Sequence, residues 1–244
     1  MKQTIWTVLE NVPIAEGTLR LRLAGDTSAL TAPGQFVNIA VENGFLRRPI
    51  SVCDASDGEA VLLYRAVGKG TRWLAGQGAG KKLDVLTGLG NGFDLSAAGD
   101  APLLVGGGIG AAPLYGLAGA LRRQGKSVRV ALGFKTAAEV FYEEEFRALG
   151  CEVRVATEDG SRGARGFVTQ LLPERYSCFY ACGPTPMLRA VCAAAKGRGQ
   201  VSLEERMGCG FGACMGCTCR TKEGARRVCR EGPVFWKEAL EWES

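Results

Sequence analysis

The chain has 244 residues, 46% of them hydrophobic, and a formal net charge of +5, so it is long and apolar enough to bury more than one core. Its basic residues are scattered rather than clustered, which argues against nucleic-acid binding, and no apolar run approaches the roughly 18 residues of a membrane span. The first 12 residues lack the pattern of a signal peptide, so we expect a cytoplasmic protein with no nucleic-acid and no membrane partner.

Residues 1–98 are predicted to form an antiparallel β-barrel. Alternating apolar and polar residues at 18–25, 35–41 and 59–67 are separated by turns rich in Gly, Pro, Asn and Asp. Several short strands at this spacing are typical of a closed barrel.

Two segments of this barrel carry groups suited to a phosphate-bearing ligand. In RRPIS, Arg48 offers a planar fork for a pyrophosphate, and Ser51 offers a hydroxyl that would lie near a flavin ring. In VGKGT, Thr71 can cap a short helix whose N-terminus, with Gly68 and Gly70, would form a second anion site. Taken alone, each segment could equally be an ordinary turn of the barrel.

Residues 99–201 alternate between predicted strands and helices. The expected strands lie at 102–108, 127–134, 151–157 and 178–183, and the expected helices at 111–125, 137–150 and 185–197. This alternation is typical of a parallel α/β sheet. We therefore expect an α/β nucleotide-binding domain after the barrel.

The turn after the first of these strands is rich in glycine. Gly106, Gly108 and Ala111 fit the pattern G-x-G-x-x-A, which lets a pyrophosphate approach the backbone at a helix N-terminus. The acidic residue expected about twenty residues further on is missing, because the next strand runs into Lys135. Lys135 and Arg129 could suit a 2′-phosphate, so the choice between NADH and NADPH stays open. The alternative is a tight strand–helix turn without a ligand.

The segment YACGPTPM ends the last predicted strand of the sheet. Gly183 and Pro184 break the strand at the carboxyl edge, where open α/β sheets bind their ligands. Cys182 would lie at the same edge and is a candidate catalytic residue. It could equally be a small thiol packed in the core.

Residues 202–244 are predicted to form a metal-binding module. The chain has 10 Cys and no His, so sulfur must hold any metal, and a Rieske-type cluster, His-ligated zinc and His acid–base catalysis are excluded. Cys209, Cys214, Cys217 and Cys229 follow the plant-type [2Fe–2S] spacing, C-x4-C-x2-C with a fourth cysteine downstream.

Small residues occupy the spaces between these cysteines, which lets backbone N–H groups approach inorganic sulfides; they are Gly210, Gly212, Ala213 and Gly216. Structural zinc is the alternative, although zinc loops favour paired C-x2–4-C knuckles. Cys219 could replace one of the four ligands, or it could be a packed thiol.

The order of these motifs along the chain resembles that in the ferredoxin–NADP reductase superfamily. Within it, the chain is most similar to the electron-transfer subunits of the heteromeric dihydroorotate dehydrogenase, the PyrK family. The similarity rests on RRPISVCD, YRAVGKGTRWL, LLVGGGIG, YACGPTPML, SLEERMGCGFGACMGCTC and RVCREGPVF, among other segments, and covers nearly the whole chain. Departures occur at Thr87 and Gly88, where Gly-Pro is expected, and at Ala112, where Pro is common.

The resemblance implies an α+β multidomain fold with three modules: an FAD-binding barrel (1–98), an NAD-binding α/β domain (99–201) and a [2Fe–2S] loop module (202–244). FAD would be held by Arg48, Pro49, Ile50, Ser51, Tyr64, Arg65, Ala66, Gly70 and Thr71. NAD(H) would face Gly106, Gly107, Gly108, Gly110, Cys182, Gly183 and Pro184, and the cluster ligands would be Cys209, Cys214, Cys217 and Cys229. Ser51 and Cys182 are the candidate catalytic residues.

The electron order follows from the cofactors. A nicotinamide exchanges two electrons as hydride, a [2Fe–2S] cluster takes one at a time, and a flavin does both, so FAD must lie between them. A (β/α)8 barrel alone needs ~250 residues, which leaves no room for an orotate site. The expected partner is therefore an FMN-containing dihydroorotate dehydrogenase catalytic subunit, in a heterotetramer of two copies each. Electrons would pass from its FMN through the cluster and FAD to NAD in pyrimidine biosynthesis.

Other interpretations stay open at this point. The chain could be the flavin and iron–sulfur reductase subunit of another complex, of the sulfhydrogenase or NADH-dependent ferredoxin:NADP oxidoreductase type. It could also be a non-enzymatic binding module with structural zinc. The apolar residues of the C-terminal tail could pack toward a partner or cover the cysteine loop as a small core; they are Val234, Phe235, Trp236, Leu240 and Trp242.

Overall fold

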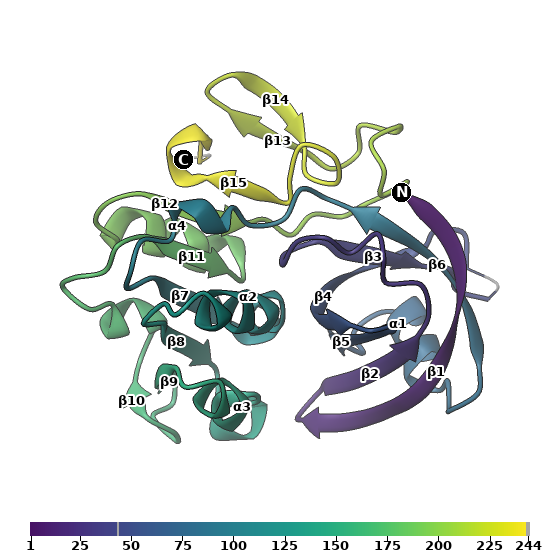
Figure 1. The fold of residues 1–244 in the computed structure, drawn as a ribbon, viewed down its shortest axis with the longest axis horizontal. Coiled ribbons are helices and arrows are strands. Elements are labelled where there is room, and N and C mark those ends of the chain that lie inside the picture. Colours follow the sequence, from purple (N-terminus) through teal and green to yellow (C-terminus); the bar gives the residue numbers. More distant parts are fainter. Residues whose placement is uncertain (43, 243–244) are drawn as a thin grey trace.

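A computed structural model describes residues 1–42 and 44–242; residues 243 and 244, with which the predicted C-terminal module ends, lie outside the described residues. The chain forms a closed barrel, a seven-stranded sheet flanked by helices, and a two-stranded ribbon (Figure 1). The strands are β1 (Lys2–Ala15), β2 (Thr18–Ala24), β3 (Phe36–Ile39), β4 (Arg48–Ser56), β5 (Glu59–Arg65), β6 (Lys82–Leu89), β7 (Leu103–Gly107), β8 (Arg129–Phe134), β9 (Glu152–Thr157), β10 (Ala164–Arg165), β11 (Phe179–Cys182), β12 (Gly199–Ser202), β13 (Thr218–Thr221), β14 (Gly224–Arg227) and β15 (Val234–Trp236). The helices are α1 (Lys69–Ala75), α2 (Ala111–Arg123), α3 (Glu143–Ala148) and α4 (Thr185–Ala194).

The barrel confirms the predicted antiparallel architecture of the N-terminal part. Its six strands close in the order β1-β2-β5-β4-β3-β6. Alternation along each strand directs every second side chain inward, so Leu21 and Leu23 of β2 meet Val37 and Ile39 of β3 in one buried cluster around Trp6. The intervening residues face outward and are available for contacts with the rest of the molecule.

The second layer is a mostly parallel sheet with the order β10-β9-β8-β7-β11-β12-β15, which confirms the expected α/β domain. Its central strands are apolar on both faces because helices cover both. Leu104 of β7 packs with α2 and α3, whereas its neighbour Leu103 packs with α4. The carboxyl ends of these strands therefore meet at one edge of the sheet, as the glycine motifs require.

One predicted helix is shorter than expected. Residues 137–150 form a 3₁₀ turn (Ala137–Glu139), an irregular step and then α3. The break lies at Tyr142, whose backbone is left-handed with φ of 61°. Its ring packs edge-to-face against Tyr115 of α2, with centroids 5.0 Å apart. Tertiary packing of this aromatic side chain therefore overrides the helical pattern.

The C-terminal tail packs into this chain. β15 pairs antiparallel with β12 at the end of the sheet, and Val234, Phe235 and Leu240 are buried. Phe235 and Leu240 share an apolar cluster with Cys217 and Cys229. Of the two open interpretations, the core that covers the cysteine loop is the one observed for these residues.

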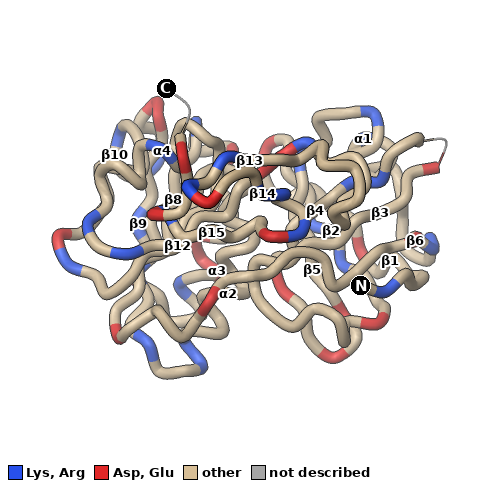
Figure 2. The backbone as a smooth tube through the Cα atoms, turned by 90° about the horizontal axis from the view of Figure 1, so that it is seen from above, with Lys and Arg blue, Asp and Glu red and all other residues tan. Residues whose placement is uncertain are grey.

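The barrel and the sheet are in close contact. A Cβ atom built on Gly116 of α2 would lie 2.7 Å from the carbonyl oxygen of Cys53 on β4, so only glycine allows this approach. Basic and acidic residues are interspersed along the backbone in both halves of the molecule (Figure 2). Among the described residues, no helix is long and apolar enough to cross a membrane.

Candidate functional site

The structure brings the four predicted cluster cysteines together at the end of the molecule that carries β13 and β14. The N–H groups of Ala213 and Cys214 donate to Cys209 Sγ at 3.2 and 3.4 Å, and the N–H of Cys209 donates to Cys214 Sγ at 3.4 Å. The N–H of Cys229 donates to Cys217 Sγ at 3.4 Å. The sulfurs thus lie as two pairs, Cys209 with Cys214 and Cys217 with Cys229.

This pairing bears on the kind of metal the loop can hold. A tetrahedral zinc site needs four ligands that converge on one point, whereas a [2Fe–2S] cluster takes two ligands at each of two irons. Two pairs of sulfurs fit the second requirement.

Backbone donors shape the electrostatics of the loop. Burial acts to raise the pKa of Cys209, but N–H groups of Phe211, Cys214 and Ala213 outweigh it and lower that pKa to about 6. Such donors favour a thiolate, the form that binds metal. Burial and the neighbouring Cys217 raise the pKa of Cys229 to about 12.

Cys219 lies apart from this arrangement. It sits on β13 and lines a separate cavity of about 480 Å³ between α4 and the ribbon, together with Arg189 and Trp242. Burial raises its pKa. Of the two open interpretations, a packed thiol fits this position better than a ligand.

In the predicted flavin segment, Arg48 and Gly70 meet. Arg48 begins β4, and a Cβ atom built on Gly70 would lie 2.2 Å from Arg48 Nε, so the guanidinium covers the first turn of α1. The helix begins at Lys69, two residues before the expected cap, and Thr71 lies inside it. The hydroxyl of Thr71 accepts a hydrogen bond from the N–H of Gly68 at 3.0 Å, which closes this turn.

The other predicted flavin residues divide between two faces of the barrel. The side chains of Ile50 and Tyr64 belong to the barrel interior, where Tyr64 donates a hydrogen bond to Asn11 Oδ1 at 2.9 Å, so only their backbones are available to a ligand. By the alternation of β4, Pro49 and Ser51 face outward. Ala66 follows β5 directly.

Arg65 lies where the barrel meets the sheet. It forms an ion pair with Glu139 at 3.6 Å, but its buried Nε has no hydrogen-bond partner among the described residues. A buried donor of this kind is stabilised by an acceptor on a ligand. Together with Arg48 over Gly70, it fits a large phosphate-bearing group held along the barrel.

A cavity of about 450 Å³ opens at the carboxyl edge of the sheet, the edge at which the sequence predicts a dinucleotide site. Gly107, Gly108 and Pro184 line it. A Cβ atom on Gly107 would lie 2.2 Å from Met187 Sδ, and one on Gly110 would lie 2.3 Å from the carbonyl oxygen of Cys182. The backbone contact makes glycine necessary at Gly110, whereas a side chain at Gly107 would require Met187 to move. Gly106 and Gly183 are not among the described residues that line the cavity.

Neither candidate catalytic residue is among the described residues that line this cavity. Cys182 is only 1% exposed and belongs to the core on the α2 side of the sheet. Burial raises the pKa of its thiol well above the usual range, so it is a neutral group. Ser51 lies on β4 opposite Phe36.

Charged residues also line the cavity; the sequence had suggested Lys135 for a 2′-phosphate but had not indicated the acidic residues beside it. Lys135 lines it with Glu139, Glu158 and Glu204. The side chain of Glu204 is exposed at the cavity. The surrounding protein atoms reduce the hydration of its carboxylate, which raises its pKa. Arg129 lies at the opposite end of β8 and pairs with Glu152 at 3.5 Å, so it is remote from the ligand edge and the expectation of a 2′-phosphate contact there was wrong.

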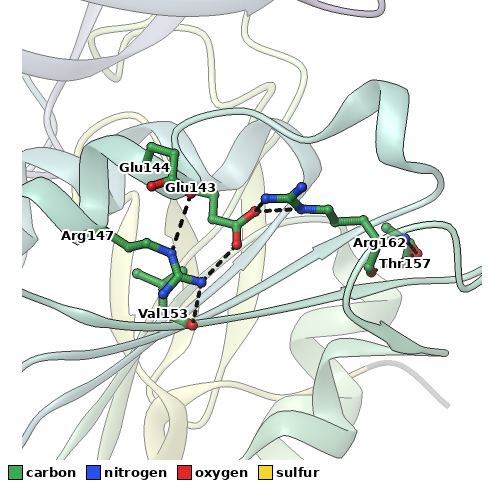
Figure 3. Close-up of polar contacts among 6 residues, drawn as sticks. All are labelled: Glu143, Glu144, Arg147, Val153, Thr157 and Arg162. Carbon is green, nitrogen blue, oxygen red and sulfur yellow. Dashed lines mark hydrogen bonds and ion pairs between the residues drawn. The ribbon is translucent and has the colours of Figure 1, made fainter.

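An ion-pair network fixes the loop after β9, which contributes Glu158 and Gly166 to the cavity wall. Figure 3 shows the Glu143 carboxylate between Arg147 and Arg162. The distances are 2.9 Å from Arg147 Nη2 to Oε1 and 2.9 Å from Arg162 Nη2 to Oε2. Because Glu143 begins α3, its ion pair with Arg162 links this helix to the loop.

Comparison with known families agrees with this geometry. Residues 204–241 match the family described as the iron-sulfur cluster binding domain of dihydroorotate dehydrogenase B, and residues 104–193 match the oxidoreductase NAD-binding domain. The first range contains all four paired cysteines, and the second contains the glycine loop and Cys182.

Proteins that are similar over nearly the whole length of the chain belong to the same enzyme system. The chain is 48% identical to the electron transfer subunit of dihydroorotate dehydrogenase B (NAD(+)) from Bacillus caldolyticus, over 94% of this chain and 95% of that protein. It is 42% identical to the subunit of the same name from Fusobacterium nucleatum, over 100% of both.

Among solved structures, an NADH-dependent reduced ferredoxin-NADP oxidoreductase matches with a TM-score of 0.87 and 31% identity, over 97% of this chain and 89% of that chain. A ferredoxin NADP+ reductase from Neisseria gonorrhoeae, with bound FAD and NADP, shares the fold with a TM-score of 0.69 and 16% identity, over 80% of this chain and 90% of that chain.

Proposed function

The chain belongs to the family of electron transfer subunits of dihydroorotate dehydrogenase B, and from this premise we propose that it passes electrons between NAD and a catalytic subunit through FAD and a [2Fe–2S] cluster. Its working modules are residues 1–98 for FAD, 99–201 for NAD and 202–244 for the cluster. When bound, FAD supplies the exchange between hydride and single electrons. The residues of this chain bind and position the cofactors.

The observation that carries the proposal is the contact of the cysteine loop with the barrel. Phe36 of β3 and Leu86 of β6 share one buried apolar cluster with Cys217 and Cys229. Phe36 is paired across strands with Ser51 of the flavin segment. The two predicted cofactor sites therefore lie on one continuous packed unit, which suits direct electron transfer between them.

The proposed dinucleotide site also reaches the barrel. Arg65 of β5 lines the nucleotide cavity together with Gly107 and Pro184. One residue thus belongs both to the predicted flavin set and to the wall of the dinucleotide cavity. This supports the order NAD, FAD, cluster along the molecule.

We assign Cys209, Cys214, Cys217 and Cys229 as the cluster ligands, because their pairing fits two irons better than one zinc. Cys214 is the exposed member, and the apolar side chains of Phe211 and Met215 beside it are 41% and 53% exposed. Apolar groups around an exposed ligand suit protein docking. The FMN-containing catalytic subunit would dock here, with two copies of each chain in the complex.

The second candidate is the role of the NADH-dependent ferredoxin-NADP oxidoreductase, whose structure this fold matches. That protein is 31% identical to the chain, whereas the dihydroorotate dehydrogenase subunits reach 48%. The difference favours the dihydroorotate assignment. A zinc-binding module without flavin does not explain the position of Arg48 over Gly70 or the buried Arg65 Nε that has no hydrogen-bond partner among the described residues.

The test compares two cysteine variants after anaerobic reconstitution. In Cys214→Ser, we expect the visible absorbance and the paramagnetic resonance of the cluster to be lost, while NADH still bleaches the flavin. In Cys219→Ser, the matched control, we expect both to remain. An unchanged cluster spectrum in Cys214→Ser would overturn the ligand assignment, and a colourless wild-type protein with zinc would overturn the proposed function.

A further inference from the structure

Asn38 of β3 joins the barrel to the cysteine loop. Its side-chain Nδ2 donates a hydrogen bond to the carbonyl oxygen of Cys209 at 3.2 Å. The two residues are 171 positions apart in the chain, and Asn38 is only 1% exposed. A contact so remote in sequence and so well buried is a defined feature of the fold.

The barrel side of this contact is held rigidly. Asn38 pairs with Pro49 of β4 and with Leu86 of β6, so its backbone lies in the middle of the sheet. Its carbonyl oxygen also accepts a hydrogen bond from Arg47 Nη1 at 3.3 Å. Arg47 in turn forms an ion pair with Asp84 at 2.8 Å. The strand that carries Asn38 is therefore fixed against the RRPIS segment.

The loop side is equally constrained. Gly210, directly after Cys209, has φ of +78°, and a Cβ atom there would lie 2.3 Å from Asn38 Nδ2. A side chain at this position would displace either the Asn38 amide or the loop and would break the contact. The N–H of Cys209 donates to Cys214 Sγ, so the residue that Asn38 holds also supports a second cysteine.

Packing alone does not account for Asn38. Its Oδ1 is buried and has no hydrogen-bond partner among the described residues. A buried amide that is only half satisfied destabilises the fold relative to an apolar residue of similar size. The benefit of this side chain therefore lies in its one hydrogen bond, to the peptide of a cysteine.

We propose that Asn38 is a positioning residue for electron transfer: its hydrogen bond to Cys209 fixes the cluster-binding loop against the β3–β4 pair that carries the flavin segment. This inference rests on the proposed function. Asn38 lies outside the cysteine and flavin motifs, yet it controls electron transfer between the flavin and the cluster. Electron transfer from NADH to the flavin does not depend on Asn38.

The test separates these two steps by rapid mixing with NADH under anaerobic conditions. Asn38→Asp keeps the shape but replaces the donor with a carboxylate that repels the Cys209 carbonyl. We expect flavin bleaching at the wild-type rate, a several-fold slower reduction of the cluster, and an altered resonance spectrum of the reduced cluster. Asn38→Ser, a smaller donor, should restore part of the rate, and it serves as the second variant if the aspartate prevents folding.

Asn91→Asp is the matched control, because Asn91 also joins the barrel side to the C-terminal segment, through Val234 and Glu231, without contacting a cysteine. Wild-type cluster reduction and an unchanged spectrum in the iron-loaded Asn38 variants would overturn the inference. Equal losses in the Asn38 and Asn91 variants would also overturn it, since they would indicate a general structural role. A wild-type protein that binds no cluster would instead refute the proposed function.

Discussion

At the scale of single residues, the proposed flavin site contains a glycine that leaves room for an arginine side chain over a helix turn. The planar guanidinium of Arg48 needs open space above the first turn of α1, and Gly70 is the residue that leaves it. Arginine can form paired hydrogen bonds with phosphate through its planar guanidinium, and a fixed orientation favours them.

Gly70→Ala is expected to weaken FAD binding. Its new Cβ atom would lie 2.2 Å from Arg48 Nε and would displace the guanidinium. Loss of charge-assisted hydrogen bonds amounts to about 1.5–3 kcal/mol, or roughly a tenfold to hundredfold rise in Kd. Flavin fluorescence titration measures this change.

Gly78→Ala is the matched control, because a Cβ atom at Gly78 meets no heavy atom within 4 Å. Its affinity for FAD should equal that of the wild type. Equal affinities in the Gly70 and Gly78 variants would contradict the role of Arg48.

The sequence predicted local features at this scale well. The cysteine spacing and the glycine loop are contiguous motifs, and the structure forms each of them as expected. It could not predict partners that are remote in sequence. Nothing near Asn38 pointed to Cys209, and nothing near Cys182 indicated that its thiol is buried away from the cavity.

At the scale of elements, α3 and the loop after β9 form one unit through Glu143 (Figure 3). Burial acts to raise the pKa of Glu143, but hydrogen bonds from Arg147 and Arg162 outweigh it and lower the pKa below the ordinary value of 4.5. A lowered pKa in the folded state contributes stability above the unfolded pKa, and this contribution is lost as the pH falls through the folded pKa.

Glu143→Gln should therefore destabilise the protein at pH 7 but much less in acid. With both arginines partly exposed to solvent, we expect a loss of about 1 kcal/mol, or roughly 2–4 °C in Tm, at neutral pH. The difference from the wild type should shrink as the pH falls below about 4.5. Thermal unfolding followed by circular dichroism at pH 7 and in acid measures it.

Glu144→Gln provides the control on the same helix, because the Glu144 side chain is 76% exposed and pairs with Arg147 only at 3.7 Å. Its Tm should stay close to that of the wild type at both pH values. A Glu143→Gln deficit that does not change with pH would contradict the ionic origin of the effect.

Element boundaries were predicted where a pattern was local and strong, as for α2 and α4. They were missed where tertiary contacts decide. The helix expected at 137–150 is interrupted because the ring of Tyr142 packs on Tyr115. β15 was read only as an apolar tail, since its strand partner β12 lies in another module.

At the scale of the whole molecule, the three predicted modules share cores. The barrel residues Phe36 and Leu86 pack with Cys217 and Cys229, and β15 extends the sheet of the nucleotide domain. The cavity, the barrel and the cysteine loop are in contact in this order, which suits a protein that positions cofactors. Such a role does not require acid–base catalysis by histidine. Sequence motifs predicted the order of the modules, but their mutual contacts became visible only in the structure.

Electron transfer from dihydroorotate to NAD through this chain can be tested directly. The anaerobically reconstituted protein is mixed with an FMN-loaded dihydroorotate dehydrogenase catalytic subunit, and the dihydroorotate-dependent reduction of NAD is measured. We expect activity that requires both chains and that is lost with Cys214→Ser but kept with Cys219→Ser. If NADH bleaches the flavin while dihydroorotate reduces no NAD in the presence of the catalytic subunit, the assignment to dihydroorotate oxidation is contradicted.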